Sequence, residues 1–429
     1  MKPFIIKLIS LLTVVAVITA AFTLLSPRPA LPVNAKINEK GELVLYYSDG
    51  SNKSLGKLEG QQGESGEQGP VGSTGADGQD GIITIVPDDS TIALAAAKGL
   101  QSAVSIACMK GDTPLSYGSG VIYKYDKALG EAFIITNYHV VYNESKKAVN
   151  NEIVAYIYGA EYIAFQMKAE YVGGSPTNDI AILHVSNSDV LKKSDCAAVA
   201  VASPEDLIIG STAIAVGNAK GMGTSVSSGI VSVDSEYITM DAPDGSGELN
   251  FRVMRMDTAV NPGNSGGGLY NAAGELIGIV NAKISSTSVE NIAYAIPSDL
   301  ATAVADNIID NCYQKTNKNA IKATFGVNIS ISNSKAVYDN QTGQISIVEA
   351  IRVSEEPTSN SLIWGKLFKG DVLLSVSIGD YTRNITRMHH VTEITLRVRE
   401  GDVVEFKVLR DGEEQTVSVT VTQRYLSVC

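Results

Sequence analysis

The chain contains 429 residues, 44% of them hydrophobic and 19% charged, which fits a folded protein of two or three domains and excludes a disordered chain. Its formal net charge of -12 argues against nucleic acid as a partner, because phosphate backbones are bound by clustered Lys and Arg and the longest basic runs here are Lys146-Lys147 and Lys192-Lys193. None of the four cysteines stands at CxxC spacing, so no metal site is indicated; we expect scattered buried or terminal thiols, although an exported chain could form one disulfide.

The N-terminus has the pattern of an export or membrane segment. Lys2 and Lys7 precede an uncharged apolar run, Leu8–Ser26. The run could be a cleaved signal, cut after Ala20 or Ala35. Its length is nearer the roughly 20 residues that cross a bilayer, so we favour a retained anchor over residues 1–28. The preceding lysines would then leave the remainder on the extracytoplasmic side of the cell membrane, or secreted if the segment is cleaved.

Residues 33–59 are expected to form a small β-hairpin segment. Gly41–Tyr47 is strand-like, and Asp49-Gly50 is a hairpin turn signal.

Residues 60–81 place a glycine at every third position, from Gly60 to Gly81. Only glycine fits at the axis of three polyproline-II chains, so this period predicts a short collagen-like stalk. Pro70 is its only proline, and the alternative is a flexible glycine-rich tether.

Residues 91–314 alternate short apolar runs with glycine-rich punctuation, which predicts barrels or a sandwich. Helices are expected over Ala95–Leu100 and from Ser298 to Cys312. Predicted strands include Gly120–Tyr123, Ala132–Ile135, Ile153–Ile157, Ile180–Leu183, Ala213–Val216 and Leu276–Val280. The last block, residues 320–424, alternates strands and turns again and ends in a hairpin, with Val403–Leu409 turning at Asp411-Gly412 into Gln415–Thr420.

The strongest local chemical signal is the glycine-rich loop around Ser265, in the string Asn261–Leu269. A hydrolytic nucleophile needs a tight turn whose backbone N–H groups face a developing oxyanion. Glycines on both sides let the backbone approach a scissile carbonyl. We therefore assign Ser265 as a candidate nucleophile, with the N–H groups of Gly263 and Ser265 as oxyanion donors and Asn264 as a further contributor.

A serine hydroxyl needs a base to remove its proton. Of the four histidines, His139 follows an apolar strand at a turn, where its ring can project into a cleft. His184 is expected to be structural or at the surface, and His389 and His390 are expected to be solvated. His139 is the candidate base.

The imidazole needs a carboxylate that holds its tautomer and offsets its charge. Asp179 leads directly into an apolar strand, where it could also be only a turn residue. The order His139, Asp179, Ser265 is that of the chymotrypsin-type double barrel, which favours the catalytic interpretation.

Three segments that contain these residues resemble the signature segments of HtrA/Deg-type serine proteases: Thr136–Val141, Asn178–Leu183 and Asn261–Gly267. Further similarities are found in Gly118–Ile122, Ser228–Ser232 and Ala293–Ser298. The resemblance implies a mainly β chain, with a chymotrypsin-like double β-barrel protease domain at 91–314 followed by a PDZ domain at 320–424. It also implies His139 as general base, Asp179 as its orienting acid, Ser265 as nucleophile and a homotrimeric assembly.

The segment Ala323–Ile329 resembles the carboxylate-binding loop and ligand strand of PDZ domains. The backbone N–H groups of Phe325, Gly326 and Val327 would hold the carboxylate of a peptide C-terminus while the peptide adds to the sheet edge. A longer polar region, Asn333–Glu349, departs from the family pattern.

Together these features predict a membrane-tethered extracytoplasmic serine endopeptidase that acts on unfolded or misfolded proteins and needs no cofactor or metal. The alternative is a catalytically silent trimeric surface scaffold or chaperone that binds peptide C-termini through its PDZ domain.

Overall fold

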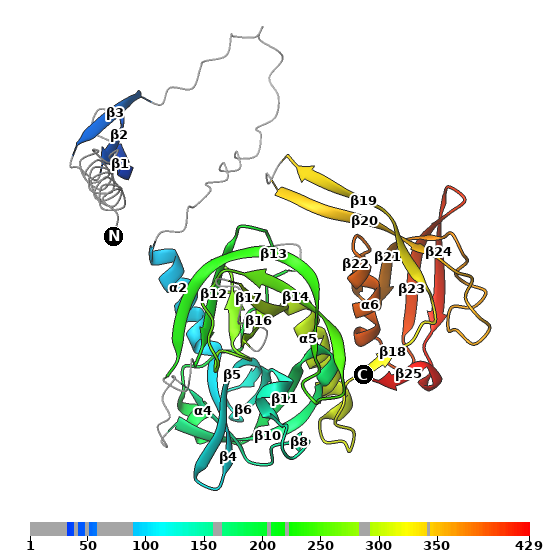
Figure 1. The fold of residues 1–429 in the computed structure, drawn as a ribbon, viewed down its shortest axis with the longest axis horizontal. Coiled ribbons are helices and arrows are strands. Elements are labelled where there is room, and N and C mark those ends of the chain that lie inside the picture. Colours follow the sequence, from blue (N-terminus) through cyan, green and yellow to red (C-terminus); the bar gives the residue numbers. More distant parts are fainter. Residues whose placement is uncertain are drawn as a thin grey trace, which may run out of the picture. The chain divides into compact units, whose positions relative to one another are not determined.

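The computed structural model describes residues 32–37, 42–47, 51–57, 89–157, 165–203, 207–218, 223–282, 292–340 and 344–429. The chain divides into two compact units, residues 1–82 and 83–429 (Figure 1). The predicted N-terminal anchor and the glycine-repeat stalk lie outside the described residues. Within the described ranges, no helix combines the length and apolar character needed to span a bilayer.

The first unit contains a three-stranded antiparallel sheet of β1 (Pro32–Ile37), β2 (Glu42–Tyr47) and β3 (Asn52–Lys57). β2 coincides with the strand predicted over 41–47, and it pairs with a strand on each side rather than forming a single hairpin.

The second unit begins with α2 (Asp89–Ser102), which is longer than the predicted Ala95–Leu100. Six strands then close into a first barrel in the order β10-β11-β6-β5-β4-β9. Their bounds are β4 Ala103–Lys110, β5 Thr113–Asp126, β6 Glu131–Thr136, β9 Ile153–Ile157, β10 Gln166–Ser175 and β11 Ile180–Val185. Short elements connect them: α3 Tyr138–Val141, β7 Tyr142–Asn143, β8 Ala148–Val149, η2 Pro176–Asn178 and α4 Asp189–Lys193.

A second closed barrel has the strand order β12-β13-β14-β17-β16-β15. Its strands are β12 Thr212–Gly217, β13 Ser225–Asp241, β14 Glu248–Met256, β15 Gly268–Tyr270, β16 Leu276–Asn281 and β17 Ala293–Pro297. α5 (Ser298–Cys312) follows, with the bounds that the sequence predicts.

The continuous apolar run in β11 has a structural reason, because both of its faces are buried. Successive side chains of a strand point to opposite faces. Ile180 and Ile182 therefore join a core that also contains residues of the second barrel and α5, whereas Ala181 and Leu183 fill the first barrel. The two barrels and α5 thus share one core, which holds the loop before β11 in a fixed place.

The C-terminal domain contains a sheet in the order β19-β20-β21-β23-β24, with β22 paired to β21. Its elements are β18 Ile321–Ala323, β19 Ile329–Asp339, β20 Gln344–Val353, β21 Val372–Ile378, β22 Tyr381–Asn384, α6 Met388–Arg397, β23 Val403–Arg410, β24 Glu413–Thr420, η6 Gln423–Tyr425 and β25 Leu426–Val428. β23 and β24 form the predicted terminal hairpin. Asp411 and Gly412 both have positive φ, 51° and 86°, as the two central residues of a type I′ turn require.

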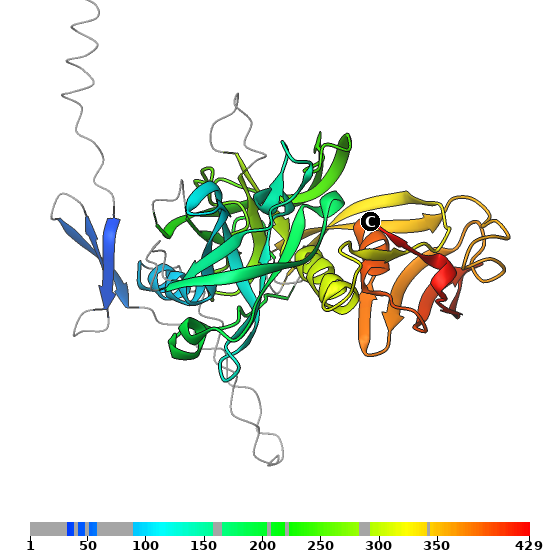
Figure 2. The same ribbon diagram turned by 90° about the horizontal axis from the view of Figure 1, so that it is seen from below.

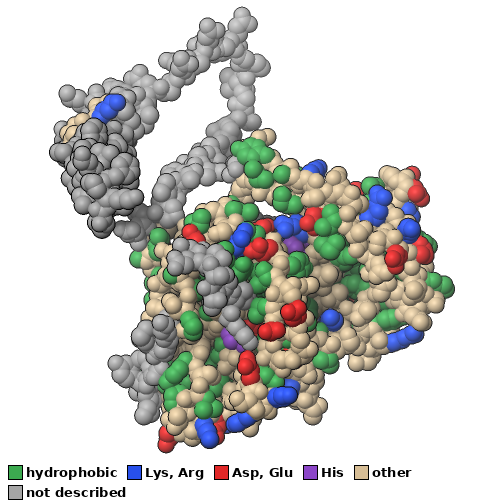
Figure 3. All heavy atoms as spheres, in the orientation of Figure 1, with side chains coloured by type: hydrophobic (Ala, Val, Ile, Leu, Met, Phe, Trp, Pro, Cys, Tyr) green, Lys and Arg blue, Asp and Glu red, His purple; other side chains and the backbone are tan. Residues whose placement is uncertain are grey.

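The polar region that departs from the family pattern is an extended arm formed by β19 and β20 (Figure 1). Only Ile351 and Arg352 of β20 pair with β21, so the outer part of the arm is a two-stranded ribbon. Near its tip Tyr338 pairs with Ile345, and the two side chains are 59% and 64% exposed. Figure 3 shows hydrophobic side chains gathered on this tip.

The C-terminal domain packs on the second barrel and α5. α5 lies beside α6 in both views (Figures 1 and 2). The fully buried Asn307 of α5 joins them, because its Nδ2 donates to the carbonyl oxygens of Ile321 and Leu396 and its Oδ1 accepts from the Ile321 N–H at 2.8 Å.

A buried ionic cluster reinforces this interface. The Arg252 guanidinium of β14 lies 3.1 Å from Asp299 of α5 and 2.7 Å from Glu393 of α6, and its side chain is 7% exposed. Arg383 of β22 lies 3.7 Å from Asp299. Burial raises the pKa of Glu393 to about 7, even though Arg252 opposes the rise. Burial would also raise the pKa of Asp299, but Arg252 and Arg383 together bring it below its ordinary value.

Candidate active site

The loop that carries Ser265 contains a tight turn just before β15. The Asn264 N–H donates to the Asn261 carbonyl at 2.9 Å, Pro262 occupies the second position and Gly263 the third, with φ 101°. A proline followed by a glycine with positive φ fits a type II turn. Type I and type II turns differ by a flip of the central peptide, so the conformation of Gly263 sets the direction of its own N–H.

A glycine is also required directly after Ser265. Gly266 has φ 84°, and a Cβ there would overlap the carbonyl oxygen of Ser119 and the hydroxyl oxygen of Thr136. The loop that carries Ser265 therefore packs directly on the segment that precedes His139.

Two of the three predicted oxyanion donors are free. The N–H groups of Gly263 and Ser265 have no hydrogen-bond partner in the part of the chain that the structure describes. The Asn264 N–H instead closes the turn, so it is not available to a substrate. One free N–H thus comes from Gly263 within the turn and the other from Ser265 directly after it.

His139 and Asp179 form a direct hydrogen-bonded pair. His139 lies on α3, immediately after β6, and its Nδ1 is 2.7 Å from Asp179 Oδ2. The backbone N–H of His139 donates to the other carboxylate oxygen, Oδ1, at 2.9 Å. Asp179 is fully buried and has a left-handed φ of 50°, a conformation that Asp adopts more readily than most residues. Two bonds from one residue fix the carboxylate against the ring.

Sequence reasoning missed a further partner of this carboxylate, Asn281. Its Nδ2 donates to Asp179 Oδ2 at 2.7 Å, and the side chain is 1% exposed. Asn281 ends β16 of the second barrel, so the bond crosses between barrels. The Asp179 carbonyl also accepts from Asn137 Nδ2 at 2.9 Å. The only sequence signal for Asn281 is a polar residue that ends the apolar run Leu276–Val280.

Ser265 lies beside this pair without a hydrogen bond to the His139 ring within the described residues. Its Oγ accepts from the Ala282 N–H at 3.2 Å, and Ala282 directly follows Asn281. Ser265 is 5% exposed. The structure thus joins His139 to Asp179, and the neighbouring residues Asn281 and Ala282 bond to Asp179 and Ser265 respectively.

The other histidines have structural surroundings. His184 is buried and stacks on Phe133, with ring centroids 4.7 Å apart, and burial lowers its pKa. The expectation that His389 and His390 are solvated is wrong for His389, which is 5% exposed in the interface between α6 and the second barrel. Burial lowers the pKa of His389 and, with the nearby Arg383, lowers that of His390 to about 4.

The predicted carboxylate-binding loop lies between β18 and β19. Phe325 is 3% exposed and packs edge-on against Phe406, and Gly326 has φ 71° with no room for a Cβ beside Ser361. Over the described ranges, the N–H groups of Phe325, Gly326 and Val327 have no hydrogen-bond partner. Three successive N–H groups are therefore available as donors.

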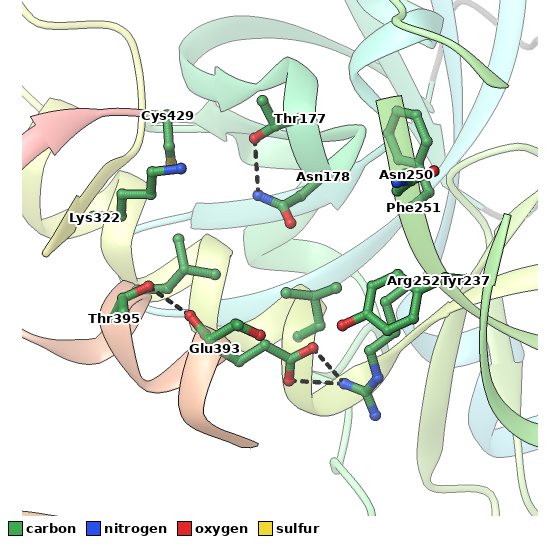
Figure 4. Close-up of a pocket in the computed structure, with 13 residues that line it drawn as sticks. Thr177, Asn178, Tyr237, Asn250, Phe251, Arg252, Lys322, Glu393, Thr395 and Cys429 are labelled. Carbon is green, nitrogen blue, oxygen red and sulfur yellow. Dashed lines mark hydrogen bonds and ion pairs between the residues drawn. The ribbon is translucent and has the colours of Figure 1, made fainter. Parts of the chain in front are cut away.

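A pocket of about 200 Å³ lies between the barrels and the C-terminal domain, apart from the His139–Asp179 pair and Ser265 (Figure 4). Thr177 and Asn178, which precede Asp179, lie on one side of it and Glu393 on the other. None of His139, Asp179 and Ser265 lines it.

The four cysteines are free; Cys108, Cys196 and Cys312 are buried, and Cys429 is partly exposed.

The fold and site define a trypsin-like peptidase domain, and the model of the family described as "Trypsin-like peptidase domain" matches residues 118–279. "Serine protease Do-like HtrA" of Bacillus subtilis is 30% identical over 326 residues, which cover 73% of this chain and 65% of that protein. "Serine protease Do-like HtrA" of Lactococcus lactis subsp. lactis is 30% identical over 319 residues, covering 72% of this chain and 71% of that protein. The solved structure "HtrA-type protease AlgW with tripeptide" is 26% identical, with a TM-score of 0.46, and covers 77% of this chain and 96% of that one.

The chain belongs to the HtrA family of serine proteases. It spans 65% and 62% of the length of the two Bacillus subtilis relatives, HtrA and HtrB.

Proposed function

We propose that this protein is a serine endopeptidase that hydrolyses peptide bonds through an acyl-enzyme on Ser265. One observation carries the proposal: the His139 ring is bonded to a buried carboxylate beside a serine loop with two free N–H groups. Family membership supports the same activity.

The hydrogen bonds of His139 and Ser265 leave the atoms needed for proton transfer available. With Nδ1–H donated to Asp179, the Nε2 lone pair of His139 is left to accept the Ser265 proton. Because Ser265 Oγ accepts from Ala282, its own proton stays available to that base. The buried Asp179 carboxylate then offsets the charge of the imidazolium.

Attack by Oγ on the scissile carbonyl carbon moves the carbonyl electron pair onto oxygen, where the N–H groups of Gly263 and Ser265 would stabilise it. Collapse of this intermediate expels the amine, which takes the proton from His139. Water then hydrolyses the ester with His139 again as base.

Covalent labelling tests this proposal. A fluorophosphonate probe should modify Ser265 of the wild type in a one-to-one ratio, mapped by peptide mass analysis. Ser265→Ala should remain folded and unlabelled, because the nucleophile is absent. A wild type that binds peptides but takes up no probe would instead favour the silent scaffold.

We further propose that the substrates are unfolded or misfolded polypeptides, so that the protein serves quality control. The proposal rests on membership in the HtrA family. A reduced, unfolded protein should be cleaved faster than its folded form; equal rates would contradict this choice of substrate.

The domain at 320–424 is proposed to act as a PDZ domain that binds peptide C-termini. The free N–H groups of Phe325, Gly326 and Val327 support a carboxylate site, and β19 offers a sheet edge to an added strand. A fluorescent peptide with a free C-terminus should bind at least about tenfold more tightly than its C-terminal amide, because the amide lacks the charge. Equal affinities would contradict carboxylate recognition.

Membrane tethering with the protease domain on the extracytoplasmic side, and a homotrimeric assembly, complete the proposal. The apolar run Leu8–Ser26 supports the anchor, and the glycine period of residues 60–81 supports three chains. A monomeric mass for the detergent-extracted chain would contradict the trimer.

A further inference from the structure

Ser119 of β5 occupies the junction between the two barrels and the nucleophile loop. It is 1% exposed. Its Oγ donates to the Gly263 carbonyl at 2.7 Å and accepts from the Asn218 N–H, at the end of β12, at 2.8 Å. Its backbone N–H donates to the Ser265 carbonyl at 2.8 Å, and its carbonyl accepts from Thr136 Oγ1 at 2.7 Å. One residue therefore bonds to both barrels, to the serine loop and to the strand end before His139.

These bonds act on alternate peptide groups of the serine loop. The Gly263 carbonyl belongs to the peptide that joins Gly263 to Asn264, and the Ser265 carbonyl belongs to the one that joins Ser265 to Gly266. The two free N–H groups belong to the neighbouring peptides. Because a trans peptide is planar and of fixed length, each held peptide fixes the positions of the Cα atoms at its two ends.

The hydroxyl has a particular effect on Gly263. A flip of the central peptide of the turn would turn the Gly263 N–H away but would leave the following peptide in place, so a bond to the Gly263 carbonyl acts on where Gly263 lies rather than on the flip. The Ser119 hydroxyl holds the following peptide through the Gly263 carbonyl, while the Asn218 N–H fixes the hydroxyl in turn.

We propose that Ser119 is a positioning residue for the oxyanion hole: its hydroxyl holds Gly263 in the place from which its N–H reaches the substrate oxygen. This inference rests on the proposed peptidase activity, and it concerns the transition state rather than substrate binding. Removal of the hydroxyl should then lower kcat with little effect on KM, because the donor matters most when charge develops on the oxygen.

Ser105 is a matched control. It lies opposite Ser119 in the register of β4 and β5 and is also 1% exposed. Its Oγ has no hydrogen-bond partner among the described residues. Ser105→Ala removes a buried hydroxyl from the same place in the barrel without touching the serine loop.

The experiment compares the full-length wild type, Ser119→Ala and Ser105→Ala on one peptide substrate, with rates normalised to the sites labelled by a fluorophosphonate. Complete loss of an oxyanion donor costs about 100- to 1,000-fold in kcat. A donor that is only misplaced should cost less, so we expect about 10- to 100-fold for Ser119→Ala, KM within about twofold, and no change for Ser105→Ala.

A second readout separates positioning from general destabilisation. A peptide boronic acid forms a tetrahedral adduct on the serine, so its affinity should fall in parallel with kcat/KM in Ser119→Ala. A merely structural hydroxyl would lower the melting temperature and leave both quantities unchanged. If Ser119→Ala folds poorly, Ser119→Cys, which keeps a weaker donor, should give an intermediate kcat.

The outcomes also separate the two proposals. An active wild type with Ser119→Ala equal to Ser105→Ala per labelled site overturns the role of Ser119 alone. A wild type that neither takes up the probe nor hydrolyses peptide overturns the proposed function, and the role of Ser119 with it.

Discussion

Asp179→Asn is expected to lower kcat by about 10⁴-fold while leaving the fold intact. Three donor groups converge on the Asp179 carboxylate: the N–H and Nδ1–H of His139 and the Nδ2–H of Asn281. An amide has one oxygen and one NH₂ group, so it cannot accept from all three. The imidazole would then accept at Nδ1 and carry its proton on Nε2, where no lone pair remains for the Ser265 proton.

The measurement is kcat on a peptide substrate, with circular dichroism as the check on folding. Asp189→Asn on α4 is the matched control, because its side chain is 80% exposed and lies outside the site. It should retain full activity. An Asp179→Asn enzyme within about tenfold of wild type would show that the carboxylate does not set the tautomer of His139.

Arg252→Ala is expected to lower the free energy of unfolding by about 3–5 kcal/mol, because it leaves the buried carboxylates of Asp299 and Glu393 without their shared cation. Arg255→Ala on the same strand is the control. Arg255 pairs with Glu236 at 3.3 Å, but the two side chains are 35% and 29% exposed, so its loss should cost about 1 kcal/mol or less.

The loss in Arg252→Ala should depend on pH. Burial already raises the pKa of Glu393 to about 7, and removal of the guanidinium, which opposes this rise, should raise it further, so the folded state holds more protons than the unfolded state. Stability then falls as pH rises. Urea denaturation at pH 5 and pH 8 should show the larger deficit at pH 8. A deficit as small as that of Arg255→Ala at both values would mean that the cluster does not stabilise the interface.

Much of the fold follows from patterns between residues that are close in the sequence. The apolar run of β11, the helix from Ser298 to Cys312 and the Asp411-Gly412 turn all coincide with observed elements. Each depends on a local pattern: a short continuous apolar run for the strand, start and stop signals for the helix, or a positive φ for the turn. The glycines around Ser265 predict a tight turn for the same reason, because the turn requires them whatever the loop packs against.

The chain order of histidine, acid and serine likewise singled out His139 and Asp179, which the structure joins, and Ser265, whose loop packs on the segment before His139. The contacts that position these residues could not be predicted from the sequence pattern. Asn281 and Ser119 are each one polar residue in a strand, and their importance depends on partners about a hundred or more positions away, on the other barrel. The prediction that His389 is solvated is wrong, because the polar stretch that contains it is buried when α6 packs on the second barrel. The ion pairs of Arg252 were not predictable for the same reason. Local patterns specify each strand and helix. Only the packing of the barrels, α5 and α6 decides which polar groups are buried together and must therefore bond to one another.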